Sequence, residues 1–302
     1  MALAWHCLSF EALVRLVGRA EALGYDAAFV DGDVSQLGGA NPRAALEGWT
    51  VTTALLARTR RIGIGSIRLV HHWNGARLAQ AVATAEAIFP GRLRFLISIG
   101  GHAIDRAFGL PFPGVGERVR WLDEMLPALR ALWAGERTST TGRYVRLEGA
   151  IVRPTPPPGL PRIAVAARAP SLLKVVARHA DLWDVNLPPV RRRVEAAAAE
   201  LARACEALGR DPAGIGRSQW IFARAGRVDP DAARSEFRRL NPWFASIPDA
   251  ELREGLVLGS PGECRDRLAE IRGSLRIDLP IVDLSGLPEG EASAQIEALA
   301  PA

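Results

Sequence analysis

The sequence predicts an α/β fold of the (β/α)8 TIM-barrel class, and three observations support this prediction. Short, almost continuous apolar runs, typical of parallel strands buried on both faces, alternate with longer segments that have apolar residues at helical spacing. Eight strand segments can be counted, which fits a closed barrel better than an open sheet. The length of 302 residues lies within the roughly 200 to 400 residues of one such barrel, so we expect a single domain over residues 1–302.

The first half of the chain supplies four of the expected strands. Ser9 is a suitable N-cap for the first helix, and Gly24 ends that helix. A second helix is expected from about residue 43 to 58, and Pro127 is expected to bend a later helix. The strands are predicted at 3–6, at 27–30, around 62–66 and around 93–99.

The second half supplies the other four strands and an insertion. Residues 144–147 predict a small extra strand, and the proline-rich run 154–158 predicts a stiff connection. Residues 229–255 have no clear pattern and predict an insertion with short helices before the last strand. The alternation otherwise continues with strands at 163–167, 181–186, 219–223 and 279–284 and helices at 171–179, 190–208 and 260–271.

The composition argues against several classes of protein. The net charge of +5 comes almost entirely from arginine, since Lys174 is the only lysine, and the arginines are scattered among acids, so no nucleic-acid partner is expected. No apolar run approaches the ~18 residues of a membrane span, and no signal peptide is recognisable. Cys7, Cys205 and Cys264 lack CxxC spacing, so we expect free thiols and a cytoplasmic protein.

Polar residues suited to chemistry gather where the expected strands end, which is where such barrels place their sites. Histidine is the side chain best suited to proton transfer near neutral pH. For each histidine the alternative is a purely structural hydrogen bond in a loop. Glycines interrupt the strands where side chains should line a cavity. The polar strand-end residues are His6, Asp33, His71, His72, His102 and Asp184.

The stretch from Ala57 to His102 also carries a family resemblance. It reads Ala-x-Thr-x-x-Ile-x-x-Gly, then Gly-Arg-Leu, then a glycine-rich strand end, and residues 19–26, 165–170 and 180–183 extend the likeness. These segments resemble the bacterial luciferase-like superfamily of flavin- and deazaflavin-dependent oxidoreductases. The resemblance implies the barrel fold, a cofactor over the strand mouths and a homodimer. The superfamily contains oxygenases, dehydrogenases and reductases.

The resemblance also implies catalytic residues. Deazaflavin-dependent members typically end the second strand in Asp-His, with the imidazole against the ring, and the matching residues here are Gly32 and Asp33. The carboxylate of Asp33 then becomes an acid, a base or a hydrogen-bond partner, unless it only caps a turn. His102 stands where sugar-phosphate dehydrogenases of the group carry a Glu. Asp33, His102 and His6 are therefore the candidate catalytic residues.

The ring of the cofactor would lie on two strand ends. Superfamily members have a backbone bulge after the position of Gly65, often with a non-prolyl cis peptide, which would lie within Ser66, Ile67 and Arg68. The alternative is a straight strand in which Ser66 faces a polar interior. Gly100 and Gly101, after the fourth strand, complete the candidate binding residues at this end.

The phosphate of the cofactor would lie after the fifth strand. Ala166 and Ala167 end this strand as in deazaflavin-binding members, but Arg168 and Ala169 replace the usual Gly-Gly or Gly-Ser. The next helix still opens with proline, followed by Ser171. Arg168 either pairs with phosphate through a charge-assisted fork or blocks the site, and the neighbouring likeness favours pairing.

The sequence thus predicts an oxidoreductase that uses coenzyme F420 for hydride transfer to or from a small organic substrate. An FMN-dependent luciferase-like monooxygenase is the first alternative. A cofactor-free barrel that binds a small molecule or performs acid/base chemistry is the second. No G-x-G-x-x-G between a first strand and its helix, P-loop, HExxH helix or G-x-S-x-G elbow is found, so dinucleotide, metal and serine-nucleophile chemistry is not expected.

Overall fold

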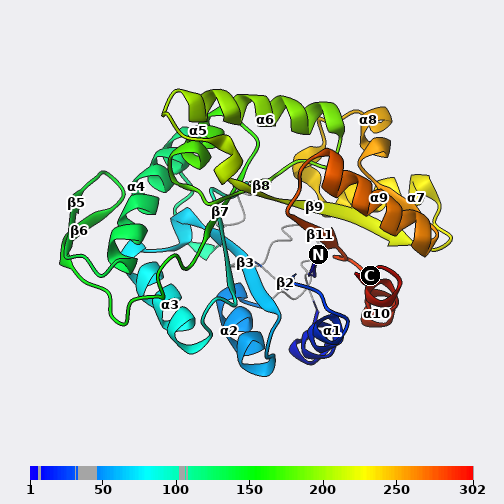
Figure 1. Ribbon diagram of the computed structural model, residues 1–302, viewed down its shortest axis with the longest axis horizontal. Coiled ribbons are helices and arrows are strands. Elements are labelled where there is room, and N and C mark those ends of the chain that lie inside the picture. Colours follow the sequence, from blue (N-terminus) through cyan, green and yellow to red (C-terminus); the bar gives the residue numbers. More distant parts are fainter. Residues whose placement is uncertain (6–7, 31, 33–45, 102–105, 107, 302) are drawn as a thin grey trace.

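A computed structural model of the chain confirms the (β/α)8 barrel (Figure 1). It describes residues 1–5, 8–30, 32, 46–101, 106 and 108–301. The parallel strands close into a ring because the last strand pairs with the first and β8 pairs with β9. In ring order the strands are β1 (Ala2–Ala4), β2 (Ala27–Phe29), β3 (Gly63–Leu69), β4 (Leu93–Ser98), β7 (Ile163–Ala167), β8 (Leu182–Val185), β9 (Gly216–Ala225) and β11 (Leu279–Asp283).

The helices surround the ring (Figure 1). The predicted Ser9 cap is confirmed, since its hydroxyl accepts from the Ala12 amide at 3.2 Å. The second helix begins at Gly48, later than predicted, because the Glu47 carboxylate caps its first amides at 2.7–2.8 Å. The surrounding helices are α1 (Phe10–Ala22), α2 (Gly48–Arg58), α3 (Gly75–Ile88), α4 (Val115–Trp133), α5 (Pro170–His179), α6 (Arg191–Glu206), α9 (Pro261–Ser274) and α10 (Glu289–Ala298).

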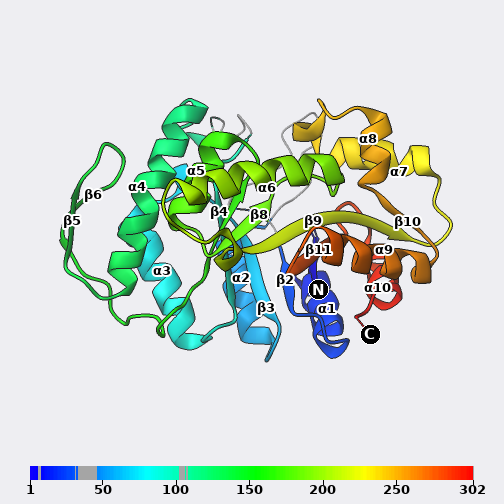
Figure 2. The ribbon, with the colours of Figure 1, turned by 45° about the horizontal axis from the view of Figure 1, so that its top comes forward.

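Two additions lie on opposite sides of the barrel (Figure 2). One is an antiparallel hairpin, β5 (Thr138–Thr141) and β6 (Arg146–Ala150), which confirms an extra strand near 144–147. The other is the predicted insertion, which holds α7 (Pro230–Leu240), the 3-10 turn η4 (Pro242–Phe244) and α8 (Asp249–Glu254). A short strand that the sequence did not predict, β10 (Val257–Gly259), follows the insertion and pairs with the end of β9.

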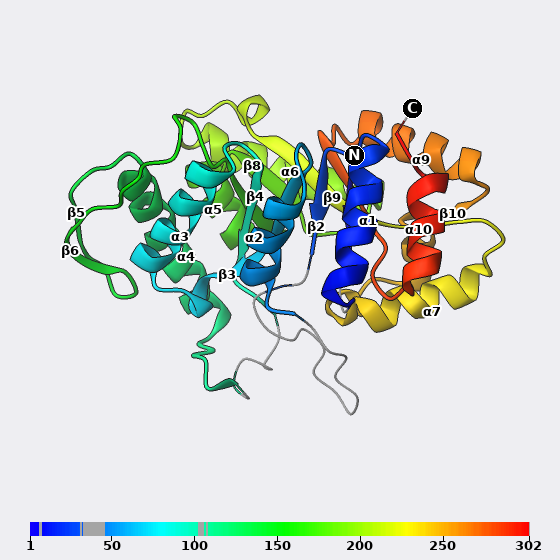
Figure 3. The ribbon, with the colours of Figure 1, turned by 90° about the horizontal axis from the view of Figure 1, so that it is seen from below.

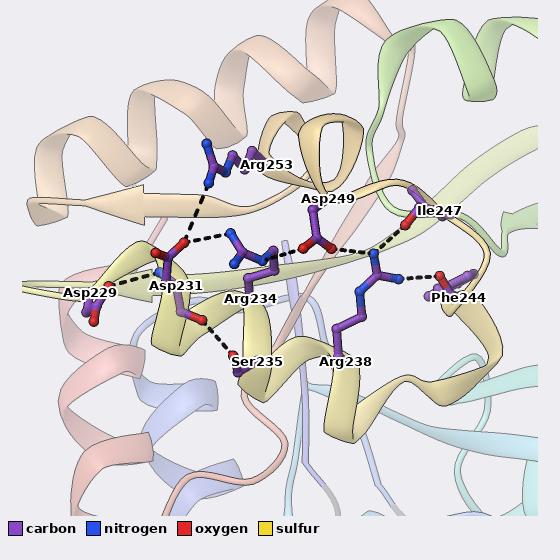
Figure 4. A network of polar contacts seen from close by, with 9 residues as sticks. All are labelled: Asp229, Asp231, Arg234, Ser235, Arg238, Phe244, Ile247, Asp249 and Arg253. Carbon is purple, nitrogen blue, oxygen red and sulfur yellow. Dashed lines mark hydrogen bonds and ion pairs between the residues drawn. The ribbon is translucent and has the colours of Figure 1, made fainter.

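The insertion has its own small apolar core and its own ion pairs. Phe237 and Phe244 stack with ring centroids 5.9 Å apart inside this core. On the surface, Arg234 and Arg238 of α7 bind Asp249 of α8 at 3.1 and 2.8 Å (Figure 4). The two helices therefore hold each other, and Phe222 and Arg224 of β9 join them to the barrel through the Phe237 ring and the Glu236 carboxylate.

The ends of the chain close the outer layer. Helices α1 and α10 lie side by side (Figure 3), joined by Arg15 to Glu289 at 2.6 Å and Arg19 to Glu297 at 3.0 Å. Among the described residues, no helix combines the length and the apolar character that crossing a membrane requires.

Apolar side chains and one arginine fill the barrel interior. A Cβ added at Gly65 would lie 2.5 Å from the Arg94 carbonyl oxygen, and one at Gly63 would lie 2.6 Å from the Arg94 guanidinium. The expectation that the glycines of the third strand line a cavity is therefore wrong, because Arg94 occupies this space. The apolar side chains of the interior are Ala2, Ala4, Ala27, Phe29, Ile67, Leu96, Ala164, Ala166, Trp220, Leu279 and Ile281.

Candidate active site

The carboxyl ends of the barrel strands define the candidate site. The three predicted catalytic residues, Asp33, His102 and His6, lie outside the described residues. All eleven predicted binding residues are described. They fall in two sectors of the rim, one at the ends of β3 and β4 and one between β7 and α5.

The end of β3 is a regular strand. Its register with β4 runs without a break from Ile64 opposite Leu93 to Leu69 opposite Ser98. The only cis peptide bonds in the described part of the chain precede Pro154 and Pro161. The predicted bulge and cis peptide within Ser66, Ile67 and Arg68 are therefore absent, and the straight-strand alternative is correct.

The side chains of this strand end alternate between the barrel and helix α2. Ile67 belongs to the barrel interior, so its neighbours Ser66 and Arg68 point outward. The Ser66 hydroxyl lies 2.8 Å from the Thr52 hydroxyl and donates to the Gly48 carbonyl at 3.2 Å. Ser66 therefore faces a polar contact with α2 and not a polar interior.

Arg68 is almost fully buried beside the start of α2. Its guanidinium donates to the Ser66 hydroxyl and lies 3.9 Å from the Glu47 carboxylate. It also lies 5.7 and 5.9 Å from the ring centroids of Trp49 and Trp73. Within this set the protein supplies the carboxylate, hydroxyl and aromatic faces that a buried guanidinium needs.

The end of β4 differs from β3 because its backbone turns sharply. Gly100 has a φ of +69°, and an added Cβ would lie 3.1 Å from His71 Cε1. This position needs glycine for both reasons. Among the described residues, no atom lies within 4 Å of a Cβ added at Gly101. His71 is buried, and its ring lies 5.6 Å from that of Phe112.

The other rim sector joins β7 to α5. Ala166 and Ala167 are buried, and the Ala167 carbonyl accepts from the Trp183 indole at 2.8 Å. Ala169 and Ser171 are exposed. Helix α5 starts with Pro170, which has no N–H, and the Leu172 and Leu173 amides both donate to the Ala169 carbonyl at 3.0 Å, so within the described residues only the Ser171 amide of the first turn has no partner. Such a helix start favours anions.

Arg168 leans away from α5 and onto the insertion. It donates to the Trp243 carbonyl at 3.3 Å, and its guanidinium lies 5.2 Å from the centre of the Phe244 ring. Burial against these groups lowers its pKa, but a guanidinium stays charged at neutral pH. No carboxylate of the described chain pairs with it. The guanidinium of Arg168 is thus fixed by a carbonyl and a ring and has no acidic partner among the described residues.

Asp184 was noted as a polar residue at a strand end but is not among the predicted catalytic or binding residues. It accepts from the Ser218 hydroxyl at 2.7 Å and is buried inside the barrel. Burial raises its pKa to about 7, and hydrogen bonds from Ser218 and Trp220 oppose this shift. No cation within the described ranges pairs with it. Asp184 is therefore a buried carboxyl group that holds its proton up to near neutral pH.

The strand register gives the depth of Asp184. Inward side chains of a (β/α)8 barrel form layers of four, each contributed by alternate strands. The registers place Asp184 in a layer with Phe29, Leu96 and Ile281. The layer above it holds Ala4, Ile67, Ala166 and Trp220. Two of the four side chains in that upper layer are alanines, so little side-chain volume separates this carboxyl group from the barrel mouth.

The parallel barrel, with charged groups at the carboxyl ends of its strands, defines the class of α/β-barrel proteins that bind ligands at this mouth. The chain belongs to the luciferase-like monooxygenase family, whose model matches residues 6–276. Among the described residues, no three His, Cys, Asp or Glu side chains are grouped so that they could hold a metal ion.

Two curated relatives are similar to part of the chain. The F420-dependent hydroxymycolic acid dehydrogenase of Mycobacterium tuberculosis is 32% identical over 173 residues, which are 57% of this chain and 47% of the relative. The F420-dependent glucose-6-phosphate dehydrogenase of Mycobacterium avium is 35% identical over 176 residues, which are 56% of this chain and 51% of the relative. The chain therefore spans about half the length of these relatives.

Solved structures share the fold over nearly the whole chain. An F420-dependent secondary alcohol dehydrogenase in complex with an F420-acetone adduct has a TM-score of 0.81 at 17% identity, covering 99% of this chain and 98% of the other. The EDTA monooxygenase of Chelativorans sp. BNC1 also has a TM-score of 0.81, at 16% identity, covering 99% and 92%. At these identities the likeness concerns the fold.

Proposed function

We propose that this chain is an oxidoreductase that binds coenzyme F420 at the barrel mouth and transfers hydride to or from a small organic substrate. The names of both curated relatives support the cofactor. The observation in this structure that carries the proposal is Arg168, a cation with no carboxylate partner among the described residues, beside the Ser171 amide at the start of α5. This combination fits the phosphate of the cofactor.

Within this proposal each rim sector has a separate task. F420 supplies a ring carbon that accepts or releases hydride without oxygen chemistry. The backbone of Gly65, Ser66, Ile67 and Arg68, together with Gly100 and Gly101, would support the ring. Ala166, Ala167, Arg168, Ala169 and Ser171 would hold the phosphate end. Asp33, His102 and His6 are the groups that we propose to move the proton.

An FMN-dependent monooxygenase is the alternative that another observation favours. The EDTA monooxygenase shares the fold as fully as the F420-dependent alcohol dehydrogenase does. Because FMN also carries a phosphate, Arg168 and α5 fit both cofactors. A barrel that works without either cofactor is the remaining alternative, in which Asp184 and the histidines would perform acid/base chemistry.

Equilibrium binding of F420 and of FMN, followed by fluorescence quenching, tests the proposal. We expect F420 to bind more tightly than FMN and Arg168→Glu to weaken it by more than about 10-fold, since charge reversal removes a charge-assisted contact. Lys174→Glu is the matched control, because it reverses another exposed cation of α5. A preference for FMN would support the monooxygenase, and binding of neither at micromolar concentration would reject both.

We also propose that the chain acts as one domain and forms a homodimer in the cytoplasm. The buried free thiols of Cys205 and Cys264 support a reducing compartment. Light scattering after size exclusion would measure the dimer, and a monomeric mass would contradict it.

A further inference from the structure

Arg168 does not act alone, because the insertion holds it in place. Its hydrogen bond and its ring contact are both with η4, at the Trp243 carbonyl and the Phe244 ring. These groups lie about 75 positions further along the sequence. One edge of the guanidinium faces the carbonyl, and an arginine carries five N–H donors, so donors remain for an anion.

Phe244 is itself fixed by the insertion core. Its ring stacks on Phe237 at 5.9 Å with an interplanar angle of 8°. Arg238 fastens the same turn by donating to the Phe244 carbonyl at 2.7 Å while it binds Asp249 (Figure 4). The ring that carries Arg168 therefore belongs to a small unit with its own packing and its own ion pairs.

The insertion unit is also tied to the barrel beside α6. Arg193 of α6 binds Glu251 of α8 at 2.6 Å, and Arg192 binds the same carboxylate. Arg224 of β9 adds a third attachment by binding Glu236 of α7 at 2.7 Å. The Arg168 attachment differs because no acid takes part in it.

We propose that Phe244 and the Trp243 carbonyl are positioning groups that present Arg168 to the phosphate of the bound cofactor. Docking of the insertion on Arg168 and binding of the cofactor then favour each other. This inference rests on the proposed function. The physical reason is preorganisation, because an arginine that is already held loses less side-chain entropy when it binds an anion. Linkage makes the effect reciprocal, so the cofactor in turn stabilises the insertion.

The test separates the phosphate from the ring by using two ligands. F420 is compared with its phosphate-free deazaflavin chromophore, with Kd measured by fluorescence for the wild type, Phe244→Leu, Arg168→Met and the double variant. We expect Phe244→Leu to weaken F420 about 3- to 20-fold and the phosphate-free chromophore less than about 2-fold. In the Arg168→Met background, Phe244→Leu should have no further effect on F420.

Phe222→Leu is the matched control, since it makes the same change in the same core at a ring that contacts Phe237 and not Arg168. It should leave the ratio of the two Kd values unchanged. An equal loss of both ligands in Phe244→Leu, or an undiminished loss of F420 in the double variant, would overturn the inference. If the wild type binds neither ligand, the proposed function fails instead.

Amide hydrogen exchange of the wild type provides the test if Phe244→Leu does not fold. We expect F420 to slow exchange across residues 230–254 and the phosphate-free chromophore to leave it unchanged. Equal protection by both ligands would contradict a coupling through phosphate.

Discussion

The rim sector at β3 and the sector at β7 and β8 surround their charged side chains in opposite ways. Arg68 at the end of β3 has a hydroxyl, a carboxylate and two aromatic rings around its guanidinium. Arg168 after β7 has no acid, and Asp184 on β8 has no cation, within the described chain. The β3 sector thus surrounds its arginine with an acid, a hydroxyl and two rings, whereas in the β7–β8 sector no described residue of opposite charge pairs with Arg168 or Asp184.

This difference separates arginines that hold the fold from arginines that are available to a ligand. Both residues lie in segments that resemble cofactor-binding positions of the family, and residue type alone does not distinguish them. Their neighbours distinguish them, because a guanidinium that is buried among its partners is not available to a ligand. The following predictions sharpen this comparison or break it.

Replacing Asp184 by Asn should have the largest effect. The folded state keeps the proton up to about pH 7, whereas the unfolded chain releases it near the ordinary pKa of an aspartate, 3.8. The free energy of unfolding of the wild type should therefore fall as pH rises between these values, by about 4 kcal/mol in all, at about 1.4 kcal/mol per unit. Asp184→Asn should remove this loss and be the more stable protein at pH 8.

Urea unfolding of both proteins from pH 4 to pH 8 checks this expectation. The two should be nearly equal at pH 4 and diverge above it. Parallel curves would mean that Asp184 is charged in the folded state and that a cation compensates it after all.

Replacing Arg68 by Met should cost about 2 to 4 kcal/mol of unfolding free energy, since a buried hydrogen-bonded charge and its aromatic contacts are lost. It should leave the Kd of F420 nearly unchanged, because this side chain faces α2. Arg168→Met should do the reverse and change stability by less than about 0.5 kcal/mol. Urea unfolding and fluorescence titration of both variants would reveal whether the two roles separate; weaker binding in Arg68→Met would break the comparison.

Replacing Gly65 by Ala should cost about 1 to 3 kcal/mol, because the new Cβ would lie 2.5 Å from backbone oxygen of Arg94. Gly18→Ala is the matched control in α1, where an added Cβ meets nothing within 4 Å. It should stabilise by about 0.5 to 1 kcal/mol. Thermal unfolding of both variants would test whether the barrel interior beside Gly65 is as closely packed as in the structure.

Replacing Ser218 by Ala should have the smallest effect. The hydroxyl lowers the pKa of Asp184, so its loss should raise that pKa further above about 7. A hydrogen bond of roughly 1 kcal/mol corresponds to an upward shift of somewhat less than one pH unit. The carboxyl band of Asp184 in difference infrared spectra reports this value directly, and an unchanged midpoint would show that Ser218 does not act on the ionised form.

The strand and helix order could be predicted because each segment has its own period. Ile163–Ala167 is a buried apolar run bounded by Pro161 and Pro170, and the structure has the same five residues as β7. The end of β9 and all of β10 were missed because their pairing depends on residues some 34 positions apart. No local pattern contains such a contact.

The candidate site was predictable in position but not in detail. Arg168 stays a predicted binding residue, and its docking on Phe244 could not be predicted because it depends on how the insertion folds back. The space at Gly65 was misjudged because Arg94, which fills it, comes from the neighbouring strand. Asp184 was visible at a strand end, but its raised pKa depends on burial that only the closed barrel provides.

The pairing of β9 with β10 has a consequence for how this barrel can diversify. Both ends of the insertion are clamped there, since the Gly226 amide donates to the Gly259 carbonyl at 2.7 Å. The helices between them have their own core and ion pairs. Residues 227–256 therefore leave and rejoin the barrel at one point, so an exchange of this segment would have to keep only its ends and its contacts with Phe222 and Arg224 of β9, besides those with Arg168, Arg192 and Arg193.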